Sequence, residues 1–257
     1  MRGGTSRAVF FAENDIAKYS SEDKNKIILT ALGSPDPYGR QIDGLGGGIS
    51  SLSKVGIIGK SSTSGIDLTF TFGQVDVRTP TIDWKGTCGN MMAAVGLYGI
   101  EENLIETQDP ITKVRILATN TSQIIDAYVP VKDGQFQVEG DYAIAGVPGT
   151  GSPIQLDFIN PSGNTTGLIL PTGSPKDTIQ ISPNKTVSVS IVDVTIPVVF
   201  VRAEDVSADI TKSPIDLDAD TALQSLLETI RVHSSQKMQL SHSADNSLVS
   251  SKAVPKV

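Results

Sequence analysis

The apolar and polar positions along the chain predict many short strands and a few helices. Residues 66–77, IDLTFTFGQVDV, alternate apolar and polar side chains and predict a half-buried strand. Alternating stretches within 109–131 predict further strands, and residues 186–201 predict two short strands broken at Pro197. Strands and helices do not alternate regularly, so the pattern indicates an α+β fold with a mostly antiparallel sheet, rather than a doubly wound one.

Two segments have the spacing of amphipathic helices. Residues 14–32 predict a loop and a helix that ends before Gly33. Residues 221–238 place leucine and isoleucine at helical intervals, with Asp218 or Asp220 available as the N-cap. Arg231 and His233 are expected on the solvated face of this helix.

A third helix is predicted inside residues 83–105, DWKGTCGNMMAAVGLYGIEENLI. The run from Met91 to Tyr98 has almost no polar face, which is typical of a buried helix. Thr87 or Cys88 would then lie at its N-terminus, where free N–H groups can bind a carboxylate and a thiol is partly ionised near neutral pH. The same pattern is also typical of a structural cysteine that caps a core helix.

Two glycine-rich segments are candidates for ligand contact. Residues 2–6, RGGTS, combine a cation, hydroxyls and free backbone amides, which suits a carboxylate, although an ordinary glycine turn has the same composition. Residues 44–60, GLGGGISSLSKVGIIGK, place serines and Lys54 after three glycines and before a strand at 55–58. This segment lacks the helix of a phosphate-binding loop and the spacing of a dinucleotide fingerprint, so a flexible surface loop is the alternative.

Composition narrows the function classes. The chain has 257 residues, 39% hydrophobic and 19% charged, and a net charge of −7, which argues against a nucleic-acid or anionic-membrane surface. A single cysteine excludes an internal disulfide framework and a cysteine-based zinc site. The two histidines, His233 and His242, are expected on the surface and argue against a histidine-rich metal centre. No long apolar stretch predicts a membrane span or a signal peptide, so we expect a cytosolic protein.

Five blocks, in order along the chain, together resemble the PrpF family. They are MRGGTSRAVFF, GLGGGISSLSKVGIIG, DWKGTCGNMMAAVG, GVPGTGSPIQLDF and GLILPTG. The resemblance implies the diaminopimelate epimerase-like fold, in which each of two similar halves wraps a curved sheet around a central helix. It also implies isomerisation of a small unsaturated polycarboxylate, such as 2-methylaconitate or aconitate, without a metal or cofactor.

The resemblance assigns roles to particular residues. Lys54 and Cys88 stand where the family places its catalytic lysine and cysteine, and they would act as an acid–base pair. The residues expected to bind substrate carboxylates are Arg2, Thr5, Ser6, Ser51, Ser53, Gly89 and Asn90.

The same resemblance predicts the domain organisation. Residues 1–167 would form a first half with the lysine–cysteine site, and residues 168–257 a partial second half, truncated relative to the family. A non-catalytic carboxylate-binding homologue and a tautomerase of an oxo-dicarboxylate therefore stay open as alternative functions. An amino-acid epimerase is disfavoured because that chemistry in this fold uses two cysteines. Exposed sheet edges leave a homodimer open as well.

Overall fold

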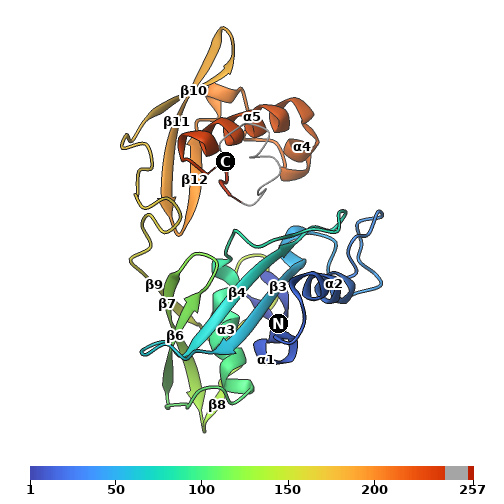
Figure 1. Cartoon of the computed structure of the whole chain (residues 1–257), viewed down its shortest axis with the longest axis vertical. Coiled ribbons are helices and arrows are strands. Elements are labelled where there is room, and N and C mark those ends of the chain that lie inside the picture. The colour runs from blue at the N-terminus through green and yellow to red at the C-terminus, as the bar shows by residue number, and fades with distance from the viewer. Residues whose placement is uncertain (241–253) are drawn as a thin grey trace. The chain divides into compact units, whose positions relative to one another are not determined.

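The computed structural model describes residues 1–240 and 254–257, so His242 lies outside the described residues. The chain forms two compact units, Met1–Asn160 (unit 1) and Pro161–Val257 (unit 2), which are described separately (Figure 1). Among the described residues, no helix has both the length and the apolar character needed to cross a membrane.

Unit 1 is built on a nine-stranded sheet whose main path is β1-β2-β3-β4-β6-β7-β8, with β5 paired to β4 and β9 paired to β7. Neighbouring strands are antiparallel except β2–β3 and β4–β6, which are parallel. The strands are β1 (Arg2–Gly3), β2 (Ser6–Ala12), β3 (Lys54–Lys60), β4 (Leu68–Val75), β5 (Ile82–Asp83), β6 (Ile111–Ala118), β7 (Gln123–Lys132), β8 (Gln135–Phe136) and β9 (Gln155–Ile159). The prediction of an α+β fold with a mostly antiparallel sheet is confirmed.

The two faces of this sheet pack against different helices. Helix α3 (Gly89–Glu101) lies against one face, and its buried residues join alternate residues of β4, β6 and β7 in the main core (Figure 1). Helix α2 (Ser21–Leu32) covers part of the other face, where Ile28 and Leu32 contact Val55 and Val75. Side chains alternate across a strand, so each strand contributes to both layers. The predicted buried helix is therefore the centre of unit 1.

Helix α2 ends before Gly33, as its sequence predicts, and it is capped at its start by Ser20. The Ser20 side chain accepts a hydrogen bond from the Asp23 amide at 3.1 Å, and Gly33 closes the helix with φ 72°. A cap of this kind satisfies a backbone donor that the first turn leaves free. Two short elements complete the helical part of unit 1, α1 (Glu13–Ile16) and the 3-10 turn η1 (Ser50–Leu52).

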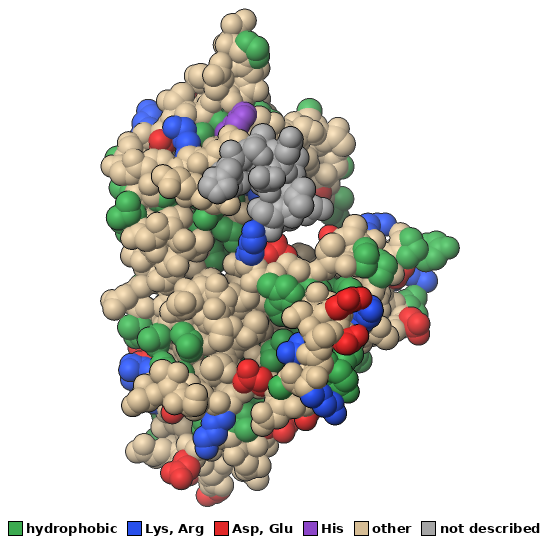
Figure 2. Space-filling view, viewed as in Figure 1, with side chains coloured by type: hydrophobic (Ala, Val, Ile, Leu, Met, Phe, Trp, Pro, Cys, Tyr) green, Lys and Arg blue, Asp and Glu red, His purple; other side chains and the backbone are tan. Residues whose placement is uncertain are grey.

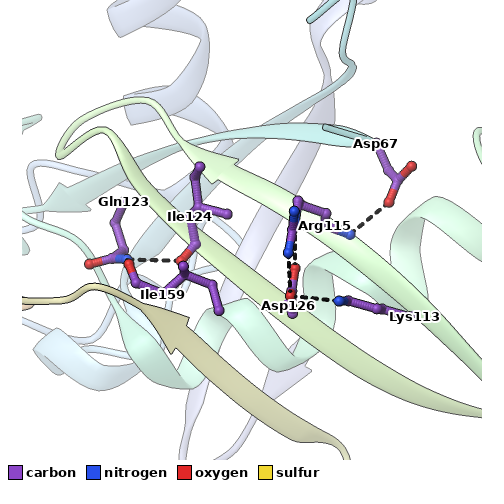
Figure 3. A network of polar contacts seen from close by, with 7 residues as sticks. All are labelled: Asp67, Lys113, Arg115, Gln123, Ile124, Asp126 and Ile159. Carbon is purple, nitrogen blue, oxygen red and sulfur yellow. Dashed lines mark hydrogen bonds and ion pairs between the residues drawn. The ribbon is translucent and has the colours of Figure 1, made fainter. Parts of the chain in front are cut away.

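A charged network lies on the face of β6 and β7 that points away from α3 (Figure 3). Asp126 is 2% exposed, and its carboxylate accepts two hydrogen bonds from Arg115 at 2.6 and 2.7 Å and an ion pair from Lys113 at 2.8 Å. Asp67 fixes the backbone of Arg115 by accepting from its amide at 2.7 Å. Chiefly the hydrogen bonds from Arg115, with those from Lys113, hold the pKa of Asp126 at about 2.

Unit 2 contains a three-stranded antiparallel sheet in the order β10-β11-β12 and two helices. Its elements are β10 (Asp177–Ser182), β11 (Lys185–Val194), β12 (Ile196–Val201), the 3-10 turn η2 (Glu204–Val206), α4 (Pro214–Ala219) and α5 (Thr221–Lys237). Lys256 forms a parallel bridge with Val198 of β12. The side chains that form the core of this unit come from the sheet, η2 and α5.

Helix α5 confirms one sequence prediction and corrects another. Asp220 is the N-cap and accepts from the Leu223 amide at 3.0 Å. Arg231, expected on a solvated face, is only 6% exposed and bonds Glu228 at 2.7 and 2.8 Å. His233 is half-buried, and its Nδ1 has no hydrogen-bond partner among the described residues. The prediction of a solvated position for Arg231 was wrong, because α5 is buried around more of its surface than the positions of its leucines indicate.

Candidate active site

The N-terminus of α3 is the centre of the candidate site. Cys88 is the N-cap residue, with extended backbone angles (φ −136°, ψ 103°), and its side chain makes no capping hydrogen bond. Gly89 and Asn90 form the exposed start of the helix, and a Cβ at Gly89 would contact only the Phe158 ring. The first N–H groups of α3 therefore lie at a surface position, next to a partly buried thiol.

The glycine turn at residues 2–6 packs directly against this helix start. A Cβ on Gly3 would overlap the backbone oxygen of Asn90, so only glycine permits this approach. The Asn90 Nδ2 donates to Thr5 Oγ1 at 2.9 Å and to Ser6 Oγ at 3.3 Å. Cys88 Sγ makes a long contact of 4.0 Å with Ser6 Oγ. Two segments far apart in the sequence thus form one polar cluster around the cysteine.

The segment that leads into Cys88 is fixed from the opposite side by Asn120. Its Nδ2 donates to the carbonyl oxygens of Phe72 and Trp84, and its Oδ1 accepts from the Phe72 amide at 2.7 Å. One side chain therefore ties the residues preceding α3 to strand β4. The Thr87 Oγ1 is buried here and has no hydrogen-bond partner among the described residues.

The sheet register places Lys54 at the same end of unit 1. Lys54 is the first residue of β3 and pairs with Ala8 of β2, two residues after Ser6. It shares a sheet face with Gly56 and Ile58, and Ile58 belongs to the core around α3. Lys54 and Ser6 thus lie on the α3-facing side of the sheet, at the end where β2 and β3 begin. Cys88 contacts Ser6 from the start of α3.

Lys54 is buried and held by specific contacts. Its residue exposure is 8%, its Nζ donates to Gln74 Oε1 at 2.5 Å, and the same atom lies 5.4 Å from the centre of the Phe72 ring. An ammonium group over an aromatic face is attracted by the ring's electron density. The side chain is therefore directed along the sheet toward β4, and does not extend into solvent.

Three further residues were predicted to bind substrate, namely Ser51, Ser53 and Arg2. Ser51 is half-buried in η1, three residues before Lys54 in the sequence. Ser53 is fully buried, and its Oγ accepts from Gln41 Nε2 at 2.9 Å. Its side chain therefore anchors the η1 turn to the interior and does not face solvent. The Arg2 guanidinium is exposed and donates to the Gly4 carbonyl of its own turn at 2.8 Å. Hydrogen bonds from Asn90 join Thr5 and Ser6 in one cluster, and Cys88 reaches it through the long contact with Ser6.

Gln74 and Gln41 are functional candidates that the sequence prediction missed. The sequence does hold a signal for Gln74, because it follows Leu68, Phe70 and Phe72 at intervals of two and so lies on the core-facing side of β4, where it is half-buried. A polar residue on the buried side of a strand requires a partner. Gln41 lies in a turn and carries no comparable signal.

The arrangement combines anion binding with proton transfer. Uncapped helix N–H groups, hydroxyls and an amide can accept a carboxylate. A thiol and an amine can each release or take up a proton. On the face of unit 1 seen in Figure 2, acidic and basic side chains are intermixed.

Comparison with known proteins identifies similar sequences over the whole chain. The family model described as PrpF protein matches residues 1–257. The 2-methyl-aconitate isomerase of Shewanella oneidensis is 36% identical over 250 residues, covering 93% of this chain and 63% of that protein. The 4-oxalomesaconate tautomerase of Pseudomonas putida is 37% identical over 257 residues, covering 100% of this chain and 67% of that protein.

A solved structure supports the same grouping. The crystal structure of methylitaconate-delta-isomerase superimposes with a TM-score of 0.71 at 38% identity, covering 95% of this chain and 62% of that chain. The chain spans 57% to 67% of the length of the curated relatives that it matches.

Proposed function

This chain belongs to the PrpF family, and from that premise we propose that it is a cofactor-independent isomerase of small unsaturated polycarboxylates, with Lys54 and Cys88 as the acid–base pair. The relatives named above act, by their names, on 2-methylaconitate, methylitaconate and oxalomesaconate. All three substrate names denote unsaturated carboxylic acids, so the substrate class proposed here is an acid of this kind.

The proposed reaction moves one proton. One of the two residues removes a proton from the carbon next to the double bond, and the electron pair left behind spreads through the double bond onto a carboxylate. The other residue returns a proton to the substrate, either at the far end of the shifted double bond or at the same carbon after rotation. The substrate keeps its atoms and its oxidation state, and the two residues exchange their protonation states.

The observation that carries the proposal is the uncapped start of α3 at Cys88. A carboxylate bound to the N–H groups of Gly89 and Asn90 would place developing negative charge at the positive end of a buried helix. Thr5 and Ser6 add hydroxyl groups beside Cys88 through their bonds to Asn90. Arg2 and Ser51 are proposed to contact a second carboxylate, because Arg2 is exposed in the same turn as Thr5 and Ser6, and Ser51 is half-buried in η1, three residues before Lys54.

The test is proton NMR of candidate acids in D2O with the purified chain. Cis-aconitate, trans-aconitate, 2-methylaconitate and methylitaconate form the panel. We expect loss of an allylic C–H signal, or conversion between isomers, that depends on both Lys54 and Cys88. Absence of exchange with every acid would contradict the proposal. Thermal stabilisation by the same acids without exchange would instead select the non-catalytic carboxylate-binding homologue.

A tautomerase of an oxo-dicarboxylate is the second candidate. The Pseudomonas putida relative favours it, because all 257 residues of this chain align with 67% of that tautomerase at 37% identity. The same proton transfer would then interconvert keto and enol forms. Adding 4-oxalomesaconate to the panel, with exchange at its carbon-bound protons as the readout, distinguishes the two substrate classes.

A further inference from the structure

The side-chain amide of Gln74 is engaged at both ends. Its Oε1 accepts from Lys54 Nζ at 2.5 Å, while its Nε2 donates to the carbonyl oxygens of Ser50 at 3.0 Å and Ser53 at 2.9 Å. Gln74 is also the direct cross-strand partner of Lys54 in the β3–β4 register. One amide therefore connects the lysine amine to both ends of the η1 turn.

These contacts fix which way the amide points. If the oxygen and nitrogen were exchanged, the NH2 group would face the lysine donor, and the oxygen would face two carbonyl acceptors. With the lysine protonated, neither contact could then be a hydrogen bond, and the oxygen would face the two carbonyls in either protonation state of the lysine. The backbone of the turn thus selects the amide orientation, and this orientation directs Oε1 at Nζ.

A second glutamine holds the turn itself. Gln41 is 1% exposed, and its Nε2 donates to Ser34 Oγ at 2.7 Å and to Ser53 Oγ at 2.9 Å. Its Oε1 accepts from the Gly48 amide at 2.9 Å, at the end of the triple-glycine segment. The carbonyls that orient Gln74 are therefore on a backbone that is anchored from the interior.

We propose that Gln74 is a positioning residue for Lys54, and that it couples the lysine amine to the serine turn at residues 50–53. This inference rests on the proposed function, because it assumes that Lys54 transfers the proton. Gln74 acts on the substrate only through Lys54. Its replacement should change the behaviour of the amine and the rate of turnover, and leave substrate affinity nearly unchanged.

Other charged and titratable groups surround this pair and enter the expected pH dependence. Asp83 of β5 lies directly across from Gln74 in the register, and Asp76 follows two residues after it. Cys88 lies at the start of α3 on the same side of the sheet. Because these groups stay in place in each variant, a shift in the titration of Lys54 reports the change at Gln74.

The experiment compares two variants with a matched control. Gln74→Met removes both functions of the amide, and Gln74→Glu keeps the shape but places a carboxylate against the amine. Gln123→Met is the control, because Gln123 is 2% exposed and its amide also donates to two backbone carbonyls, at 2.8 and 2.6 Å (Figure 3). NMR of lysine labelled at Cε follows the titration of Lys54, assigned with Lys54→Arg, and needs no turnover.

We expect Gln74→Glu to raise the titration midpoint of Lys54 by about one unit, because a carboxylate favours the charged amine. Gln74→Met should lower the midpoint, because the charged amine loses the hydrogen bond to the Gln74 oxygen. In Gln74→Met, kcat should fall about tenfold with KM within about twofold. Gln123→Met should alter neither quantity. Midpoints unchanged in both Gln74 variants, or an equal kcat loss in Gln123→Met, would overturn the inference. A wild-type chain without turnover would contradict the proposed function alone, because the titration would still decide the role of Gln74.

Discussion

Helices α3 and α5 begin in opposite ways. At α5, Asp220 accepts from the Leu223 amide at 3.0 Å, and Ser20 and Ser213 cap α2 and α4 in the same manner. At α3, the most buried helix of unit 1, Cys88 occupies the N-cap and provides no such bond. Cysteine is not among the favoured N-cap residues. The missing side-chain cap lowers the stability of the helix start by about 1 kcal/mol. Such a loss is expected at a functional site, where the first N–H groups of the helix stay available to bind a ligand.

The Asp126 network extends this comparison within unit 1. There a buried carboxylate receives hydrogen bonds and ion pairs from Arg115 and Lys113, so its charge is satisfied inside the protein. At the start of α3, the donors of Gly89 and Asn90 are exposed instead. We infer that the first region serves stability and the second serves chemistry, and the predictions below separate the two.

The largest expected effect is the loss of turnover in Lys54→Met. Removing a group that takes or returns a proton should lower kcat by about 10²- to 10⁴-fold. Methionine keeps most of the buried volume but takes the lysine donor away from Gln74 Oε1, so the free energy of unfolding of unit 1 should fall by about 1 to 3 kcal/mol. Urea unfolding followed by fluorescence of Trp84, the one tryptophan in the chain, measures that stability. A parallel loss of folding and activity would assign Lys54 to structure.

The next effect concerns Asp126 and pH. Its pKa is about 2 in the folded protein, against an ordinary value of 3.8, so the carboxylate stabilises the fold above about pH 4 and loses this contribution as the pH falls through 2. The shift corresponds to about 2 kcal/mol. Asp126→Asn should therefore lower the free energy of unfolding by about 2 kcal/mol at pH 7.

The control for this prediction is to measure the free energy of unfolding of wild type and Asp126→Asn over a range of pH. The difference between wild type and Asp126→Asn should shrink toward zero below about pH 2, because both side chains are then uncharged. Proton exchange into substrate at pH 7 should be unchanged in the folded variant. A stability difference that is independent of pH would contradict the role given to the charge.

The smallest effect compares the two helix starts directly. Asp220→Ala should lower hydrogen-exchange protection in the first turn of α5 about fivefold, the equivalent of about 1 kcal/mol for a lost cap. Cys88→Ala removes no capping bond, so protection in the first turn of α3 should stay within about twofold of wild type. Equal losses in both helices would show that Cys88 has a capping role.

The sequence predicts local features of this fold well. The apolar run from Met91 to Tyr98 identifies the buried helix, because a segment without a polar face can only pack inside. The helix end at Gly33 is confirmed, and of the two candidates given for each of the other helix starts the structure has Cys88 and Asp220. Caps depend on neighbouring residues, so the sequence can indicate them. These features require no knowledge of distant contacts.

Features that depend on strand register were not predicted. Gln74 lies 20 residues from Lys54 along the chain, and Asp126 lies 11 residues from Arg115. Which polar residues face each other across a sheet is decided by pairing, and a shift of one residue would reverse it. The burial of Arg231 was missed for a related reason, because packing around α5 comes from segments distant in sequence.

The most direct test of the central claim is Cys88→Ser, examined for exchange and for stability in the same preparation. Serine is a favoured N-cap, so we predict that the free energy of unfolding of unit 1 stays the same or rises by up to about 1 kcal/mol. We also predict that proton exchange into the substrate in D2O falls by at least about 100-fold. Retained exchange, or a loss of exchange that accompanies a loss of stability, would contradict the claim that the start of α3 is kept for catalysis.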